Sequence, residues 1–169
     1  MIMVKVVFMA LVACAVTGCS ARTQAAKPAQ GGFDREVINV VIKSDPQLNR
    51  FEKNAHALLL CLYQLKDPNG FSQLAQDRDG IPKLLECSRF DATVVNAKQF
   101  VVQPGQELKV VRGRGEGARY IGVATGYYCL GREKVTELSL LTTENGGQPS
   151  GSLVRIDLGP HEITSVKVE

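Results

Sequence analysis

Residues 57–65, ALLLCLYQL, decide the fold class of this 169-residue chain. Apart from Gln64, both faces of the stretch carry apolar or aromatic side chains. Such a run is typical of a strand that is buried on both faces, although a short buried helix has the same pattern. Tyr63 and the turn sequence Asp67-Pro-Asn-Gly70 that follows favour a short central strand.

Shorter segments with strand character lie on both sides of this central strand. Residues 36–43 alternate, with Ile38, Val40 and Ile42 on one face, and a loop at 44–56 follows. Short strands separated by turn sequences favour a two-sheet β-sandwich. The remaining strands are predicted at residues 93–103, 107–112, 118–129, 135–143, 151–158 and 161–168.

The segment between the second and third predicted strands has helical spacing instead. Phe71, Leu74 and Ala75 recur at the period of a helix, and Pro82 precedes a second apolar pair. We therefore expect two short helices around the turn at residues 77–80. The predicted fold is all-β, a two-sheet sandwich with a helical insertion.

The glycine-rich residues 112–117, RGRGEG, resemble a phosphate-binding loop only superficially. They lack the strand-to-helix context and the final Lys-Ser/Thr of such a loop. Because they lie between two predicted strands, we interpret them as a hairpin loop.

The N-terminal segment predicts membrane targeting. Residues 1–18 combine Lys5 with an apolar run that is too short to span a bilayer, and they end in small residues before Cys19. This resembles a bacterial lipobox, with Cys19 as the lipid acceptor; Cys14 and an ordinary secretory signal are the alternatives. Residues 19–34 would be the lipidated cysteine and a flexible tether, and residues 35–169 the sandwich domain. By analogy with lipoproteins, Ser20 after the cysteine implies the outer membrane, with the domain facing the periplasm.

Composition argues against several other functions. With 20 Lys and Arg against 17 Asp and Glu, the charge of +3 is too low for a typical nucleic-acid-binding protein. The two histidines, His56 and His161, have no Gly-x-Ser-x-Gly nucleophile motif to serve. Asp77 and Asp79 lack the later glutamate of a calcium loop. We therefore expect no catalytic residue, metal, cofactor or small-molecule substrate, and only a covalent lipid on Cys19.

Three cysteines, Cys61, Cys87 and Cys129, remain in the predicted domain. Their spacing does not fit a zinc site, and an oxidising periplasm favours one disulfide. We favour Cys61–Cys87, which would tie the helical insertion to the central strand. Cys61–Cys129 and three free thiols are the alternatives.

Several segments in order resemble the TssJ family, the outer-membrane lipoproteins of the type VI secretion system. The resemblance follows the lipobox and spans about residues 36–128. It rests on four segments: Leu60-Cys-Leu-Tyr-Gln-Leu-Lys-Asp67, Pro68-Asn-Gly-Phe71, Phe100-Val-Val-Gln-Pro-Gly-Gln106 and Ala118-Arg-Tyr-Ile-Gly-Val-Ala-Thr-Gly-Tyr-Tyr128.

The resemblance implies a transthyretin-like β-sandwich and a non-catalytic role. A family member would anchor the trans-envelope complex by binding the periplasmic domain of TssM, with TssL in the same complex. The contact would lie in the loop between the first two strands, here residues 44–54, with Leu48, Asn49, Arg50 and Phe51 as the candidate residues. An exposed aromatic and arginine pair is typical of an interface hot spot. The alternative is that Leu48 and Phe51 pack against the core.

Two other classes of function remain open from the sequence. One is a pilotin-like or chaperone-like periplasmic lipoprotein that escorts an outer-membrane channel. The other is an envelope hydrolase, which would require a base beside a nucleophile in a concave site.

Overall fold

The computed structural model describes residues 36–77, 79–128, 134–141 and 151–169. The predicted signal segment, Cys19, the tether and Cys129 lie outside the described residues. The elements are β1 (Val37–Ser44), β2 (Leu58–Leu65), α2 (Asn69–Gln76), α3 (Gly80–Leu85), β3 (Val94–Val102), β4 (Glu107–Gly113), β5 (Tyr120–Thr125), β6 (Thr136–Leu140), β7 (Ser152–Leu158) and β8 (Ile163–Val168).

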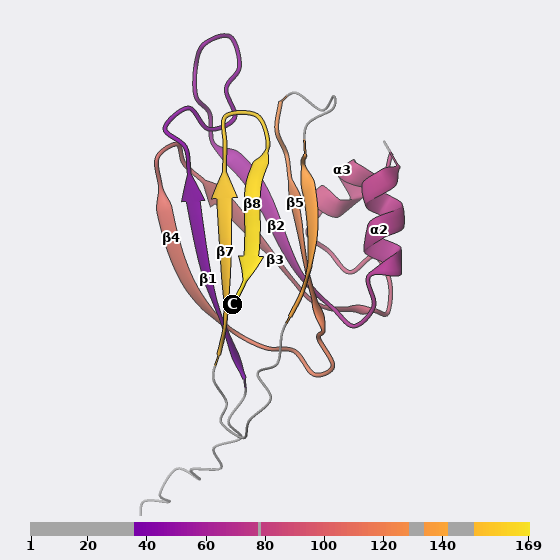
Figure 1. Cartoon of the computed structure of the whole chain (residues 1–169). Coiled ribbons are helices and arrows are strands. Elements are labelled where there is room, and N and C mark those ends of the chain that lie inside the picture. The colour runs from indigo at the N-terminus through magenta and orange to yellow at the C-terminus, as the bar shows by residue number, and fades with distance from the viewer. Residues whose placement is uncertain (1–35, 78, 129–133, 142–150) are drawn as a thin grey trace, which may run out of the picture. The chain divides into compact units, whose positions relative to one another are not determined.

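The strands form two four-stranded sheets that pack face to face (Figure 1). The first sheet has the order β4-β1-β7-β8, and the second has the order β3-β2-β5-β6. All neighbours pair antiparallel except β1 and β7, which are parallel. The sequence prediction of a two-sheet sandwich with a helical insertion between the second and third strands is confirmed.

The core between the sheets follows the alternation of the strands. Ile38, Val40 and Ile42 of β1 are at most 1% exposed, and they face apolar side chains on the inner side of β2. Burying each such side chain stabilises the fold by about 1.5–3 kcal/mol. The inner face of β2 is formed by Leu58, Leu60 and Leu62, so one face of the decisive stretch belongs to the sandwich core.

The other face of β2 lies under the helices. Cys61, Tyr63 and Leu65 form a second apolar cluster with side chains that include Phe71 of α2 and Leu84 of α3. Gly122 of β5 permits this approach, because a Cβ there would lie 2.8 Å from the Phe71 ring. Burial on both faces explains why β2 reads as a continuous apolar run.

The structure corrects the prediction for the glycine-rich segment. Residues 114–119 do not close a hairpin, because β4 belongs to the first sheet and β5 to the second. Gln64 holds this crossing: its Nε2 donates to Gly113 O (3.1 Å), and its Oε1 accepts from Gly115 N (2.7 Å). Local sequence could not distinguish a hairpin within one sheet from a connection between the two sheets, since both need a short loop between two strands.

Candidate interaction surface

The β1–β2 loop, residues 45–57, projects from one end of the sandwich (Figure 1). Its outermost part is a tight turn in which Phe51 and Asn54 exchange backbone hydrogen bonds of 2.9 Å in each direction. The two residues between them, Glu52 and Lys53, have φ angles of 46° and 70°. Turns with positive φ at both central positions usually contain Asn-Gly or Asp-Gly.

This turn stores backbone strain. A side chain held in the left-handed region costs about 1–3 kcal/mol, and such residues cluster at functional sites. Neither Glu52 nor Lys53 is a glycine, so the surrounding loop must hold the conformation against this cost. The turn therefore presents Phe51 in a fixed position.

Phe51 belongs to an exposed aromatic cluster with His56 and Tyr128. The Phe51 and Tyr128 rings lie 5.3 Å apart between centroids, and His56 meets Tyr128 edge-on at 5.1 Å. Phe51 is 44% exposed and Tyr128 is 58% exposed. An exposed, ordered aromatic group of this kind is typical of a protein-binding surface.

Backbone hydrogen bonds tie the base of the loop to neighbouring turns. Arg50 N donates to Pro160 O (2.8 Å), in the turn between β7 and β8. The carbonyl of Asp45 accepts from Gly105 N (3.1 Å), in the turn between β3 and β4. The Arg50 side chain itself is exposed, as the sequence analysis expects of a contact residue.

The structure corrects the prediction for Leu48 and Asn49. Leu48 is 0% exposed and belongs to the core between the sheets, so its side chain is not available to a partner. Asn49 is 3% exposed; its Oδ1 accepts from Tyr128 N (2.9 Å) and its Nδ2 donates to Ala57 O (3.0 Å). Leu48 thus anchors the loop through apolar burial, and Asn49 ties it to the segment that carries Tyr128.

Sequence reasoning missed Tyr128 and His56 as members of this surface. One signal was present: Tyr127 and Tyr128 are adjacent at the end of a strand, and adjacent extended residues point to opposite faces. Tyr127 is buried and its hydroxyl donates to Gly159 O (3.1 Å) and Glu162 O (2.8 Å). Burial, with a contribution from Glu162, raises the pKa of Tyr127 above its usual value, so it remains a neutral donor.

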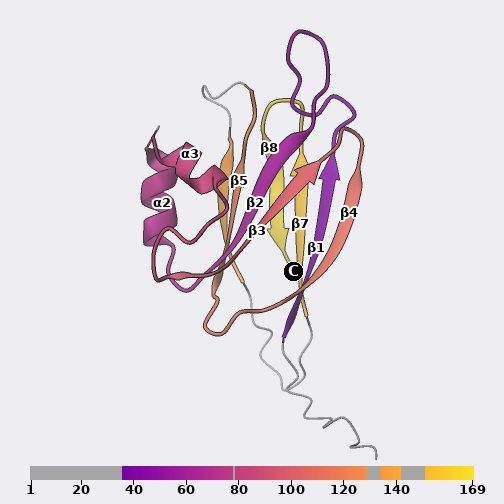
Figure 2. The ribbon, with the colours of Figure 1, turned by 180° about the vertical axis from the view of Figure 1, so that it is seen from behind.

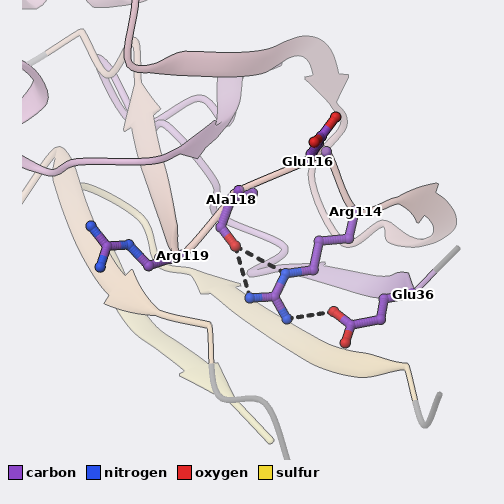
Figure 3. A pocket seen from close by; sticks show the side chains of 7 residues that line it. Glu36, Arg114, Glu116, Ala118 and Arg119 are labelled. Carbon is purple, nitrogen blue, oxygen red and sulfur yellow. Dashed lines mark hydrogen bonds and ion pairs between the residues drawn. The ribbon is translucent and has the colours of Figure 1, made fainter.

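A hollow of about 480 Å³ lies near the other end of the sandwich, between Glu36 and the β4–β5 loop. Figure 3 shows the Arg114 guanidinium between Glu36 and the backbone of Ala118, while Arg119 points away from this pair. Arg114 donates to Ala118 O from Nε (2.9 Å) and Nη2 (2.7 Å), and its Nη1 lies 2.7 Å from Glu36 Oε2. Arg114 therefore organises the loop and has few donors left for a ligand.

Among the residues that the structure describes, no group of three or more His, Cys, Asp or Glu side chains is arranged to hold a metal ion. None of the helices in the described ranges is long and apolar enough to cross a membrane.

Most of the chain matches a known protein family. A sequence model of the family described as "Type VI secretion lipoprotein, VasD, EvfM, TssJ, VC_A0113" matches residues 36–160. The chain belongs to this family. No curated protein sequence gives a significant match to the chain.

Solved structures agree with this assignment at the level of the fold. The T6SS lipoprotein TssJ1 from Pseudomonas aeruginosa has 21% identity and a TM-score of 0.65, over 80% of this chain and 97% of that one. Serratia marcescens Lip, described as a membrane-bound component of the type VI secretion system, has 19% identity and a TM-score of 0.65, over 78% and 98%. A chain of the structure described as "T6SS protein TssM C-terminal domain (869-1107) from EAEC" has 15% identity and a TM-score of 0.56, over 79% and 97%.

The family assignment gives the predicted N-terminal segment its context. The family is one of type VI secretion lipoproteins and not of enzymes. This supports lipid attachment, and Cys19 stays the predicted acceptor because it lies outside the described residues.

Proposed function

We propose that this type VI secretion lipoprotein anchors the trans-envelope membrane complex to the outer membrane by binding the periplasmic domain of TssM. The lipid on Cys19 would hold the chain in the membrane, with the sandwich facing the periplasm. TssL would belong to the same complex. Catalysis, small cofactors and substrates have no part in this function.

The observation that carries the proposal is the aromatic cluster that Phe51 and His56 of the β1–β2 loop form with Tyr128, which follows β5. Phe51 and Tyr128 are exposed, and His56 is half-buried. Folded proteins seldom hold strained backbone and exposed aromatic rings together without a functional reason. Arg50, which precedes Phe51 in the chain, is also exposed. The likeness in fold to a chain from a structure that names TssM further supports a partner of this class.

Alanine substitutions in the cluster test the proposal. We expect Phe51→Ala and Tyr128→Ala each to weaken binding of the full-length lipoprotein to the TssM periplasmic domain by about thirtyfold or more, since truncating a hot-spot aromatic costs about 2 kcal/mol or more. Binding is measured by calorimetry with the lipoprotein in detergent micelles. Leu140→Ala is the matched control, because Leu140 is 56% exposed at the other end of the sandwich.

The outcomes separate the candidate functions. If the Phe51 and Tyr128 variants bind TssM as the unchanged protein does, the site assignment is wrong. If the full-length lipoprotein copurifies with an outer-membrane channel and does not bind TssM, the pilotin-like function replaces the proposal.

A further inference from the structure

Strand β3 is an open edge of the second sheet with an exposed valine near its end. It pairs with β2 on one side, and in the sheet order β3-β2-β5-β6 no strand of the described residues pairs with its other side. Val101 is 57% exposed on this strand. An open edge with an exposed apolar side chain is a template for a further strand.

The helices α2 and α3 leave the end of β3 uncovered. Seen from behind, α2 and α3 lie on the side of β5, and the end of β3 is clear of them (Figure 2). Val101 pairs with Leu59 of β2, and Leu59 O accepts from Gly126 N (2.9 Å) after β5. Val101, Leu59 and Gly126 thus form one row across the outer face. A Cβ at Gly126 would lie 3.5 Å from Leu85 Cδ1, so α3 covers the Gly126 end of this row, while Val101 at the other end is exposed.

The Gly126 end of this row lies close to the aromatic cluster, because Tyr128 follows Gly126 by two residues. Neighbouring strands lie about 4.8 Å apart, so Val101 and Gly126 are separated by about 10 Å, and Tyr128 follows two residues later. A partner footprint of standard size covers about 800 Å², or about 30 Å across. A footprint of this size centred on Tyr128 is wide enough to include the edge of β3.

Strand β4 is an edge strand of the first sheet, and it carries charged side chains. Glu107 on β4 lies 2.9 Å from Lys109 Nζ and 3.4 Å from Lys43 Nζ of β1, so its exposed face carries an ion cluster. In β3 the only charged residue is Lys98. Charged side chains on an edge strand oppose the addition of another strand, and β3 carries fewer of them than β4.

We infer that, given the proposed function, the TssM partner adds an extended segment to β3 as a fifth strand of the second sheet. Its apolar side chains cover Val101 and Leu59, and an acidic side chain lies beside Lys98. Backbone hydrogen bonds along the edge give affinity, and these side-chain positions give specificity. The aromatic cluster and the β3 edge are then two parts of a single binding surface.

Matched substitutions on the two edges test this inference in the full-length lipoprotein. Val101→Asp and Lys98→Glu are expected to raise the dissociation constant for the TssM periplasmic domain tenfold or more. Val111→Asp is the control, because Val111 is 66% exposed on the β4 edge, and its effect is expected to stay below twofold. In the unchanged protein, amide hydrogen exchange of residues 96–102 slows in the complex while that of residues 107–113 does not.

Unchanged binding of Val101→Asp and Lys98→Glu, together with unchanged exchange in β3, overturns the inference. The proposed function survives that result if Phe51→Ala still weakens binding, and it fails if the unchanged protein does not bind TssM. Slowed β3 exchange in the lipoprotein alone at high concentration identifies a second copy as the occupant and also overturns the inference.

Discussion

Two neighbouring tyrosines take opposite roles at the residue scale. Tyr127 is 3% exposed and ties the segment after β5 to the β7–β8 turn through its hydroxyl. Tyr128 is 58% exposed and packs its ring against Phe51 and His56. The buried tyrosine fixes the backbone from which the exposed one is presented. Adjacent residues therefore serve stability and the proposed binding surface, and substitutions can separate the two.

The Tyr127→Phe substitution is expected to lower the free energy of unfolding by about 1–2 kcal/mol. It removes a hydroxyl that donates to Gly159 O and Glu162 O, and it leaves Gly159 O without that donor. Urea denaturation followed by circular dichroism measures the change. Tyr128→Phe is the control, because its ring is exposed, and an equal loss there would contradict this account.

Alkaline pH is expected to destabilise the fold through buried tyrosines. Burial, with a smaller contribution from Glu86, raises the pKa of Tyr63 to about 12, and burial raises that of Tyr127 as well. Tyrosines in an unfolded chain titrate near pH 10, so above that pH the unfolded state loses protons that the folded state retains. The free energy of unfolding should then fall by up to about 1.4 kcal/mol per pH unit for each tyrosine.

This pH dependence can be measured by urea denaturation between pH 9 and about 11.5. Tyr127→Phe removes one of the two buried tyrosines with a raised pKa. The free energy of unfolding of this variant should therefore fall less steeply above pH 10 than that of the unchanged protein. Equal slopes for the variant and the unchanged protein would contradict the role of Tyr127.

At the scale of elements, the helical insertion is fastened to the central strand at several points. Cys61 of β2 and Cys87 after α3 form a disulfide, with Cα atoms 5.3 Å apart, which is the pairing that the sequence analysis favours. Tyr63 Oη donates to Leu84 O (2.5 Å) nearby. Cys87 has a φ of 52°, so the backbone takes a left-handed conformation where the bridge forms. The helices thus cover one face of β2 as a fixed layer.

Removing the bridge with the Cys61→Ser and Cys87→Ser double substitution is expected to cost about 3–4 kcal/mol of unfolding free energy. A loop of this length regains that much chain entropy in the unfolded state. Denaturation with and without reductant measures the loss, and mass spectrometry after alkylation reports the state of the thiols. Cys129→Ser is the control; an alkylated Cys61 without reductant would contradict the bridge.

On the scale of the whole molecule, the two ends of the domain are distinct. β1 starts at Val37 and reaches the β1–β2 loop after Ser44, about 26 Å along the sandwich. Glu36, where the described chain enters the domain, lies against Arg114 in the β4–β5 loop. The loop that presents Phe51 therefore projects from the end opposite to the entry point (Figure 1). This separation leaves the proposed binding surface free of the chain entry.

Cys19→Ser is expected to release the protein from the membrane without weakening its intrinsic affinity for TssM. The acyl chains would supply the membrane affinity, at about 0.8 kcal/mol per buried CH₂. Fractionation of cell envelopes measures release, and calorimetry with the purified variant measures affinity. Membrane retention of this variant would contradict the lipid assignment, and Cys14→Ser is the matched control.

Sequence periodicity determined most of the elements. All eight described strands and both described helices lie where alternation, helical spacing and turn residues predict them, because these signals are local. The apolar run also predicted that β2 is covered on both faces, since a strand covered twice has no polar face; apart from the half-buried Leu59, all of Leu58–Leu65 is buried.

Tertiary structure alone decided how the elements combine into the proposed binding surface. The parallel pairing of β1 with β7 joins segments more than a hundred residues apart, and no local pattern records it. Leu48 and Phe51 are both apolar loop residues in the sequence, yet Leu48 is fully buried and Phe51 is exposed. Their difference, like the meeting of Phe51 with Tyr128, depends on which turns lie beside the loop, and that is a property of the assembled sheets.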